Sequence, residues 1–285
     1  MKKILSLVLA MALVLGLAAC GSSGSTSGAA AATEAAAQTS AKLEKIQAAG
    51  KLVVATDATW APFEYIGADG NATGSDMELA AYIAEKLGVE LEIMNISFDT
   101  IGAYLTSGEA DLALAAITAT EERKETLAFS DPYIVAEQYI VVRADDDSVT
   151  YFEDLDGKTI GAHLGTTGDF LVADEIAAGT IATAAEEQYK SLPDASLALI
   201  NGDIDAIVCD TLMAENLCAS RKDAIKCFAV KYKNGSVTTD PLCVAMAKGD
   251  DLFVEKINEI IAPVVSDGTY GEWIVKHTEL STNLD

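Results

Sequence analysis

The sequence predicts an α/β protein with largely parallel sheets, organised as two similar lobes. Helical and strand-like periods alternate through most of the chain beyond residue 42, as is typical of strands covered by helices. Residues 105–114 and 199–208 resemble each other, because each segment reads as a helix, a glycine cap (Gly108, Gly202) and a buried strand led by an aspartate. Ligands of open α/β sheets bind beyond the carboxyl ends of the strands. Two facing lobes would therefore form a binding cleft.

The first lobe is expected to open with alternating strands and helices. Residues 51–56 form a short apolar run that predicts a strand. Residues 75–87 have helical periodicity, and Gly88 follows them as a stop signal. We expect a second strand over residues 89–96 and a second helix over residues 99–106.

Two apolar, extended runs are interpreted as crossings between the lobes. Residues 139–143 end in a run of aspartates, and residues 228–232 run into Asn234 and Gly235. Two crossing strands would make a hinge. The resulting division gives one discontinuous lobe, 42–143 plus 234–285, and a second lobe, 144–233.

The N-terminus reads as an export signal. Lys2 and Lys3 precede an apolar run that ends at Ala19, and this run is shorter than the ~20 residues that span a bilayer. The end of the run and the two residues after it, Leu17-Ala18-Ala19-Cys20-Gly21, resemble the lipobox of bacterial lipoproteins, which implies a signal peptide over residues 1–19 and lipidation of Cys20. An uncleaved membrane helix is the alternative. Residues 20–41 are rich in Gly, Ser, Thr and Ala, and predict a flexible linker.

Composition limits the classes of function. The formal net charge of −25 argues against binding to nucleic acid or to anionic lipid headgroups. The cysteines beyond Cys20 form no CxxC pair and have no neighbouring histidine, so we expect neither a zinc site nor any other metal site. Buried free thiols are the default interpretation, although export would permit disulfides.

One segment predicts a binding chemistry directly. Arg123 follows a strand-like run and the hydroxyls of Thr118 and Thr120. An arginine beside hydroxyls near a strand end can hold a carboxylate with paired N–H donors. The alternative is a surface arginine in a salt bridge within a charged helical turn.

The chain from about Ala41 onwards resembles the polar-amino-acid-binding type of solute-binding protein that serves bacterial ABC importers. The segments that carry the resemblance are Thr56 to Glu64, Gly74 to Leu79, Ala116 to Arg123 and Gly165 to Gly168. The resemblance implies a periplasmic-binding-protein-like (type II) fold with the ligand in the cleft. It also implies an extracytoplasmic, lipid-anchored monomer that delivers an amino acid to a membrane permease without a cofactor.

The resemblance assigns roles at the amino-acid end of the ligand. Arg123 would hold the α-carboxylate, assisted by Thr118. Thr167 lies in a glycine-framed loop before a helix, where backbone N–H groups form an anion site; the alternative is that the glycines only shape a turn. Asp210 would accept the α-ammonium, or cap the next helix, or do both.

The side-chain end of the ligand is less defined. The resemblance places Trp60 and Phe98 as aromatic walls and Asp57 as an acid for the ligand side chain, which favours a polar or basic amino acid. Glu64 is interpreted as a structural residue near the hinge, outside the site. Further pocket positions that vary with the ligand are Ala116, His163 and Cys209.

Two other functions are weighed. A dehydratase-like enzyme for small acids on the same fold would need a general acid or base in the cleft, and Asp57, Glu64 and His163 keep it open. A sensory amino-acid-binding module would need a signalling or transmembrane segment, and none is recognised in the sequence. We expect no enzyme activity.

Overall fold

The computed structural model describes residues 39–283. The predicted signal peptide (1–19), Cys20 and the linker up to residue 38 lie outside these residues. The chain from Gln38 to Asp285 forms one unit, and the description below concerns this unit. Among residues 39–283, no helix has the length and apolar character needed to cross a membrane.

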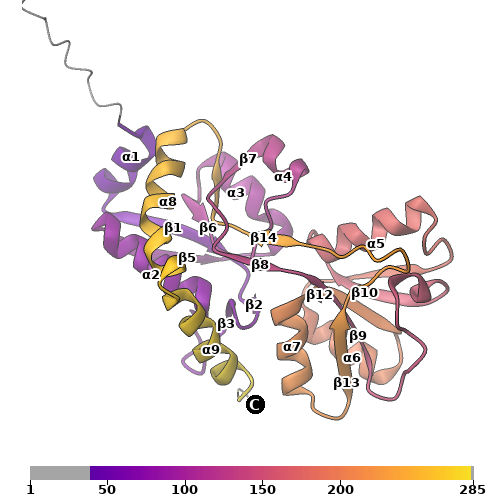
Figure 1. Ribbon diagram of the computed structural model, residues 1–285. Helices are drawn as coiled ribbons and strands as arrows, with labels where there is room; N and C mark the ends of the chain where they lie inside the picture. Colours follow the sequence, from indigo (N-terminus) through magenta and orange to yellow (C-terminus); the bar gives the residue numbers. More distant parts are fainter. Residues whose placement is uncertain (1–38, 284–285) are drawn as a thin grey trace, which may run out of the picture. The chain divides into compact units, whose positions relative to one another are not determined.

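A five-stranded sheet forms the centre of the first lobe (Figure 1). Its order is β5-β1-β6-β15-β7, and β1 pairs in parallel with β5 and β6. β15 pairs antiparallel with β6 and β7, so the lobe combines two separate stretches of the chain. The strands are β1 (Lys51–Thr56), β5 (Glu90–Asn95), β6 (Leu112–Ala113), β7 (Leu127–Phe129) and β15 (Ala245–Ala247).

The helices of this lobe come from the same two stretches, and α8 and α9 pack against α2. Leu79, Ile83 and Leu87 are buried along one face of α2, and Gly88 ends the helix in the left-handed conformation. The predicted helix over 75–87 is confirmed. The helices are α1 (Ala41–Ala49), α2 (Ser75–Leu87), η1 (Phe98–Thr100), α3 (Ile101–Ser107), α4 (Glu121–Thr126), α8 (Asp251–Ser266) and α9 (Thr269–Ser281).

Two smaller sheets complete the strands outside the lobe centres. A three-stranded antiparallel sheet follows β1 and carries Trp60 opposite Glu64. The other is a two-stranded ribbon that lies between the two large sheets in Figure 1. The strands are β2 (Thr59–Trp60), β3 (Glu64–Ile66) and β4 (Ala72–Thr73) in the first, and β8 (Ile134–Ala136) and β14 (Asp240–Leu242) in the second.

The second lobe has a five-stranded sheet of the order β11-β10-β12-β9-β13. β10 pairs in parallel with β11 and β12, whereas β9 pairs antiparallel with β12 and β13. Its elements are β9 (Gln138–Arg143), η2 (Phe152–Leu155), β10 (Thr159–His163), α5 (Thr167–Ala178), β11 (Ala185–Tyr189), α6 (Leu192–Asn201), β12 (Ala206–Asp210), α7 (Thr211–Ser220) and β13 (Ile225–Ala229).

The internal repeat predicted from the sequence is present in three dimensions. Gly108 and Gly202 end α3 and α6 in the left-handed conformation, and each is followed by a strand of its sheet. Asp111 accepts a hydrogen bond from the backbone N–H of Val53 at 2.9 Å, and Asp205 accepts one from Thr159 at 3.0 Å. Each aspartate thus fixes the start of its own strand against the neighbouring parallel strand.

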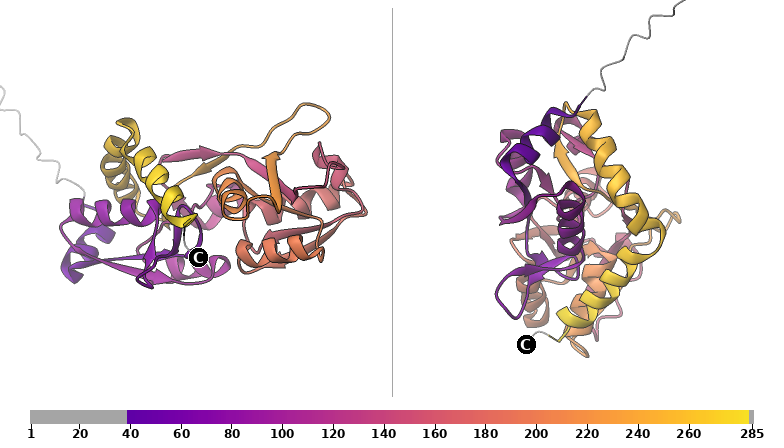
Figure 2. Two further views of the ribbon diagram at one scale, coloured as in Figure 1. Left: turned by 90° about the horizontal axis from the view of Figure 1, so that it is seen from below. Right: turned by 90° about the vertical axis from the view of Figure 1, so that its left-hand side faces the viewer.

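The prediction that residues 139–143 and 228–232 cross between the lobes is wrong. Residues 139–143 lie in β9, inside the second sheet, and residues 225–229 form β13 beside them. A run such as Ile140 to Val142 is fully buried, because an apolar run without alternation suits an internal strand. The chain passes between the large sheets through the β8–β14 ribbon instead, as the left view of Figure 2 shows.

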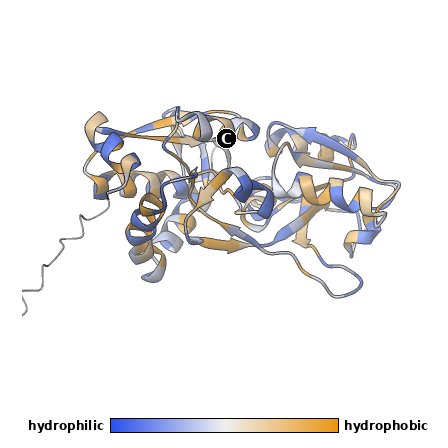
Figure 3. Ribbon diagram, turned by 90° about the horizontal axis from the view of Figure 1, so that it is seen from above, coloured by the Kyte–Doolittle hydropathy of each residue, from blue (hydrophilic) through white to orange (hydrophobic). Residues whose placement is uncertain are grey.

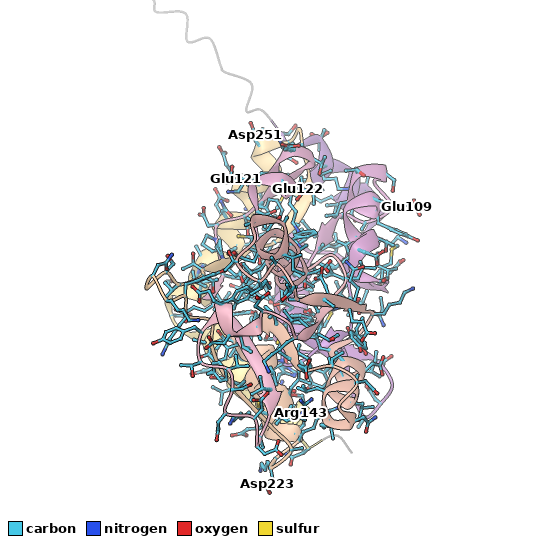
Figure 4. The ribbon with its side chains drawn as sticks, turned by 90° about the vertical axis from the view of Figure 1, so that its right-hand side faces the viewer. Glu109, Glu121, Glu122, Arg143, Asp223 and Asp251 are labelled. Atoms are coloured by element: carbon cyan, nitrogen blue, oxygen red, sulfur yellow. The ribbon has the colours of Figure 1, made fainter. Side chains whose placement is uncertain are left out.

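Polarity is distributed as burial requires. In Figure 3 the apolar colours follow strands in both lobes, and the fully buried side chains include Leu52, Leu112 and Ile140. Acidic side chains such as Glu109, Asp223 and Asp251 lie at the outline of the molecule in Figure 4 and are exposed. The high negative charge is therefore carried in large part where water solvates it.

Candidate functional site

A cavity between the two lobes has about 350 Å³ of space that protein atoms do not fill, part of which is open to solvent. Eight of the ten predicted site residues line it, and they come from both lobes. The first lobe contributes Trp60, Phe98, Ala116, Thr118 and Arg123, and the second contributes Thr167, Cys209 and Asp210. Asp57 and His163 do not line this cavity.

Arg123 reaches the cavity from α4, and its guanidinium joins the two lobes. Nη1 donates to the backbone carbonyl of Thr118 at 2.8 Å, and Nη2 donates to that of Gly165, in the second lobe, at 2.8 Å. The rings of Phe98 and Phe170 flank the guanidinium carbon at 5.3 Å and 5.9 Å, distances at which a cation is attracted to an aromatic face. Three further N–H donors of the group remain for an anion.

Arg123 keeps its positive charge although it is partly buried. Desolvation lowers the pKa of Arg123 to about 10, while Asp240 and Glu122 act in the opposite direction. A guanidinium with this pKa is protonated at neutral pH. The cavity wall therefore carries a permanent positive charge that is partly withdrawn from water, and this partial burial strengthens its attraction for an anion.

The start of α5 forms the second-lobe side of the same region. Thr166 caps the helix by accepting from the backbone N–H of Asp169, and Asp169 in turn accepts from the N–H of Gly165 at 2.7 Å. A Cβ on Gly168 would stand 2.6 Å from the carbonyl oxygen of Val208, so the helix can approach β12 this closely only with glycine. The N-terminal amides of a helix favour anions.

Asp210 lies at another lobe-to-lobe contact. One carboxylate oxygen accepts from the N–H of Met213 at 3.1 Å and caps α7, and the other accepts from Trp60 Nε1 at 2.5 Å. Both alternatives raised by the sequence are compatible, because the cap uses only one oxygen. Burial raises the pKa of Asp210 to about 6, so the carboxylate is mostly ionised at neutral pH.

Asp57 and His163 form a separate cluster behind the aromatic walls. Asp57 accepts from Thr59 Oγ1 at 2.9 Å and from the N–H of Phe98 at 2.8 Å, and His163 Nε2 lies 3.7 Å from the same carboxylate. The His163 ring centroid is 5.4 Å from that of Trp60 and 6.0 Å from that of Phe98. Burial lowers the pKa of His163, which favours the neutral imidazole.

Sequence reasoning missed two polar residues at the cavity. Gln138 lines it, and its Nε2 donates to Thr167 Oγ1 at 3.1 Å and to Asp240. Asp240 is buried and attracts Arg123 electrostatically, although burial raises the pKa of Asp240 overall. A lone amide at the head of an apolar strand was the available signal for Gln138.

Residues 52–279 match the family model described as bacterial extracellular solute-binding proteins, family 3. The chain belongs to this family. The family 3 protein is 29% identical over 228 residues to the L-cystine-binding protein TcyJ of Escherichia coli (strain K12), which covers 80% of this chain and 82% of TcyJ. It is 36% identical over 166 residues to the arginine-binding extracellular protein ArtP of Bacillus subtilis (strain 168), covering 58% and 57% of the two chains.

Solved structures agree with this assignment. AbpA of Streptococcus pneumoniae bound to L-arginine superposes with a TM-score of 0.78 at 29% identity, covering 85% of this chain and 100% of AbpA. The ancestral amino-acid-binding protein AncCDT-1, a precursor of cyclohexadienyl dehydratase, gives a TM-score of 0.72 at 30% identity, covering 83% and 99%. The two-lobed fold predicted from the sequence is thereby confirmed, and the matched family is one of binding proteins.

Proposed function

We propose that this family 3 protein binds a polar amino acid between its lobes and delivers it to the permease of an ABC importer. One observation carries the proposal. A half-buried cation, Arg123 from the first lobe, and a buried carboxylate, Asp210 from the second, line one cavity. An amino acid carries the two complementary charges on groups attached to the same carbon atom. The names of relatives that bind cystine, arginine or histidine support the same ligand class.

The amino-acid end of the ligand would be held from both lobes. The three unused N–H donors of Arg123, the Thr118 hydroxyl and the start of α5 at Thr167 surround the place for the carboxylate. Asp210 would receive the ammonium, whose three donors can reach the oxygen that Trp60 now occupies or the one at the helix cap.

The side-chain end favours a neutral polar ligand over a basic one. Asp57, the acid available for a cationic side chain, is already bonded by Thr59 and Phe98 and faces His163. The wall that remains is made of Trp60, Phe98, Ala116 and Cys209. A basic side chain would have to displace His163 before it could reach Asp57.

Ligand binding would be coupled to lobe closure. The contacts of Arg123 with Gly165 and of Trp60 with Asp210 each join one lobe to the other beside the cavity. A ligand that bridges the same groups stabilises the closed arrangement and shifts the population towards it. We place the hinge in the β8–β14 ribbon, with the lobe limits near residues 137 and 240 on its two strands.

We further propose that the protein is exported, lipidated at Cys20 and retained as a monomer at the extracytoplasmic face of the membrane. The lipobox-like segment and the following linker support this. We propose a binding protein without catalysis, because the pocket-lining acid, Asp210, is bonded by a helix cap and an indole. Neither partner is suited to transferring a proton to a substrate.

Thermal unfolding against the twenty amino acids tests the function. A ligand at about a hundred times its dissociation constant adds roughly 2.7 kcal/mol of stability. We expect one or a few polar amino acids to raise the unfolding temperature. The absence of a shift with any of them would contradict the proposal, and conversion of a bound compound to product would favour the enzyme instead.

A further inference from the structure

Two buried carboxyl groups stand directly behind the cavity wall of the first lobe. Glu64 in β3 and Asp76 in the first turn of α2 are 1% and 0% exposed. The start of α2 is tied to the segment before Glu64, since the N–H of Asp76 donates to the carbonyl of Phe63 at 3.0 Å. Gly74 makes this approach possible, because a Cβ there would stand 1.9 Å from the Phe63 carbonyl oxygen.

Asp76 collects three hydrogen bonds from different parts of the lobe. Oδ2 accepts from the backbone N–H of Ala116 and from the Tyr133 hydroxyl, each at 2.9 Å, and Oδ1 accepts from the Tyr270 hydroxyl at 2.7 Å. A buried carboxylate with three donors is the acceptor of this cluster.

Glu64 is in the opposite situation. Neither of its carboxylate oxygens has a donor among the described residues, although its carboxyl lies within hydrogen-bonding reach of Asp76. Two carboxyl groups can bond to each other only if one of them holds a proton. The group without donors is the one that must carry it, because an unpaired buried charge is very costly.

The charged groups around Glu64 act in the same direction. Burial, followed by the charges of Asp76 on α2, Asp57 after β1 and Asp210 at the end of β12, raises the pKa of Glu64 well above its usual value. The phenols of Tyr133 and Tyr270 face Asp76 and have pKa values raised by burial. The charged groups with the largest effect on Glu64 are all carboxyl groups.

The pair contacts two residues that line the cavity, Ala116 and Trp60. Ala116 lines the cavity and has φ of 46°, a left-handed conformation that a residue with a Cβ rarely adopts. Its N–H is the one that Asp76 holds. Trp60, another wall of the cavity, lies directly opposite Glu64 in the β2–β3 ladder.

We infer that Glu64 and Asp76 form a proton-sharing carboxyl pair, with the proton on Glu64, that positions Ala116 and Trp60 as the first-lobe wall of the cavity. Both are positioning residues, since neither lines the cavity. Their effect on the ligand rests on the proposed function, whereas the shared proton does not.

Urea unfolding of the ligand-free protein across pH, for wild type and Glu64→Gln, tests the proton. The unfolded chain releases the Glu64 proton above about pH 4.3 and the folded one retains it. Ionisation of Glu64 in the unfolded chain therefore raises the unfolding equilibrium constant about tenfold per pH unit. This rise ends when the pH reaches the pKa of Glu64 in the folded protein. Glu64→Gln is always neutral and keeps a donor for Asp76, so the ratio of the two unfolding constants should change about tenfold per pH unit between about pH 5 and pH 7. Parallel curves would overturn the inference.

Glu85→Gln, on the exposed side of α2, is the matched control and should give a curve parallel to wild type. Glu64→Leu, which removes the donor, tests the positioning. With the twenty L-amino acids as probes, the best binder of wild type should keep its affinity in Glu64→Gln and lose about tenfold in Glu64→Leu. Equal affinity in both variants would remove the positioning role. If no amino acid binds wild type, the proposed function fails, and the pH curves still decide the shared proton.

Discussion

The two ends of the cavity differ in how far the protein already satisfies its own polar groups. At the amino-acid end, Arg123 spends two N–H groups on backbone carbonyls and keeps three. At the side-chain end, Asp57 has two donors, and His163 packs against both Trp60 and Phe98. The α-carboxylate, which all amino acids share, thus meets unused N–H donors. The side chain, which varies, meets groups that must first give up their present partners within the protein.

Removing the Arg123 cation should have the largest effect, because it removes the main binding group for the carboxylate at the amino-acid end of the cavity. We expect Arg123→Ala to weaken amino-acid binding by at least a hundredfold, about 3 kcal/mol, because the ligand carboxylate would be buried without a partner. Isothermal titration calorimetry with the amino acid that stabilises wild type measures the loss.

Lys124→Ala is the matched control for the same helix. Lys124 is half-exposed and pairs with Glu121 on the surface, so its removal should leave affinity unchanged, since exposed pairs contribute little. Equal losses in the two variants would show that the net charge of α4, and not the clamp, attracts the ligand.

Asp210→Asn should have the next largest effect and should also change the pH dependence. Loss of the charge that receives the ammonium is expected to cost about 2 kcal/mol of binding. In wild type, burial raises the pKa of Asp210 to about 6, so affinity should rise with pH up to about 6 and then level off. The contribution of this group to the stability of the ligand-free protein runs the other way, and is lost as pH rises through about 6.

Asparagine keeps an oxygen for the Met213 cap and for Trp60, so the variant should remain folded. Its affinity should no longer change between about pH 5 and pH 7 as wild-type affinity does. Calorimetry at several pH values gives this profile. An identical profile in wild type and variant would assign the pH dependence to another group.

The same difference between the ends explains what the sequence could predict. α2 was correct to the residue because its apolar face and Gly88 are local signals. Arg123 was found because it follows a strand-like run and two threonine hydroxyls, and Asp210 was found because the family resemblance assigns an aspartate at the end of its strand. Asp240 was missed, since its contact with Gln138 joins positions 102 residues apart, and no local pattern announces it.

The crossing strands show the converse error. Residues 139–143 were apolar and extended, as a crossing strand can be, but only the sheet reveals that both faces are covered. The true crossings, β8 and β14, have three residues each and carry little periodicity. The positions of Asp57 and His163 behind the wall follow from their mutual contact, which sequence spacing cannot supply.

Opening the side-chain end should change which ligand is preferred. His163→Ala removes the ring that packs against Trp60 and Phe98 and the imidazole that lies 3.7 Å from the Asp57 carboxylate. We expect amino acids with longer or basic side chains to gain about 1 kcal/mol of affinity relative to neutral ones. A competition panel against wild type measures this ratio.

His277→Ala provides the comparison with the other histidine. His277 is equally buried but bonds to Tyr65 and Glu78, away from the cavity. It should lower stability without changing the order of ligand preference. If His163→Ala also leaves that order unchanged, residues other than His163 determine which ligand side chain is preferred, and Cys209 becomes the next position to vary.

The smallest effect should come from a lobe-to-lobe contact outside both ends of the cavity. Asn216 on α7 donates from Nδ2 to Ser281 Oγ on α9 at 2.7 Å, and both side chains are buried. A contact made only when the lobes meet favours the closed form without touching the ligand. Asn216→Ala should therefore weaken the binding of every amino acid by the same small free energy, about 0.5–1 kcal/mol.

A double-mutant cycle with Ser281→Ala isolates the bond, and small-angle X-ray scattering reports the degree of closure. Asn201→Ala, at the exposed end of α6, is the control. The two single variants and the double variant should show nearly the same loss, since either change removes the whole contact. A loss that differs from one amino acid to another would place the effect inside the cavity. The contact between Asn216 and Ser281 would then contribute to the choice of side chain, and lobe closure could not be separated from side-chain selection.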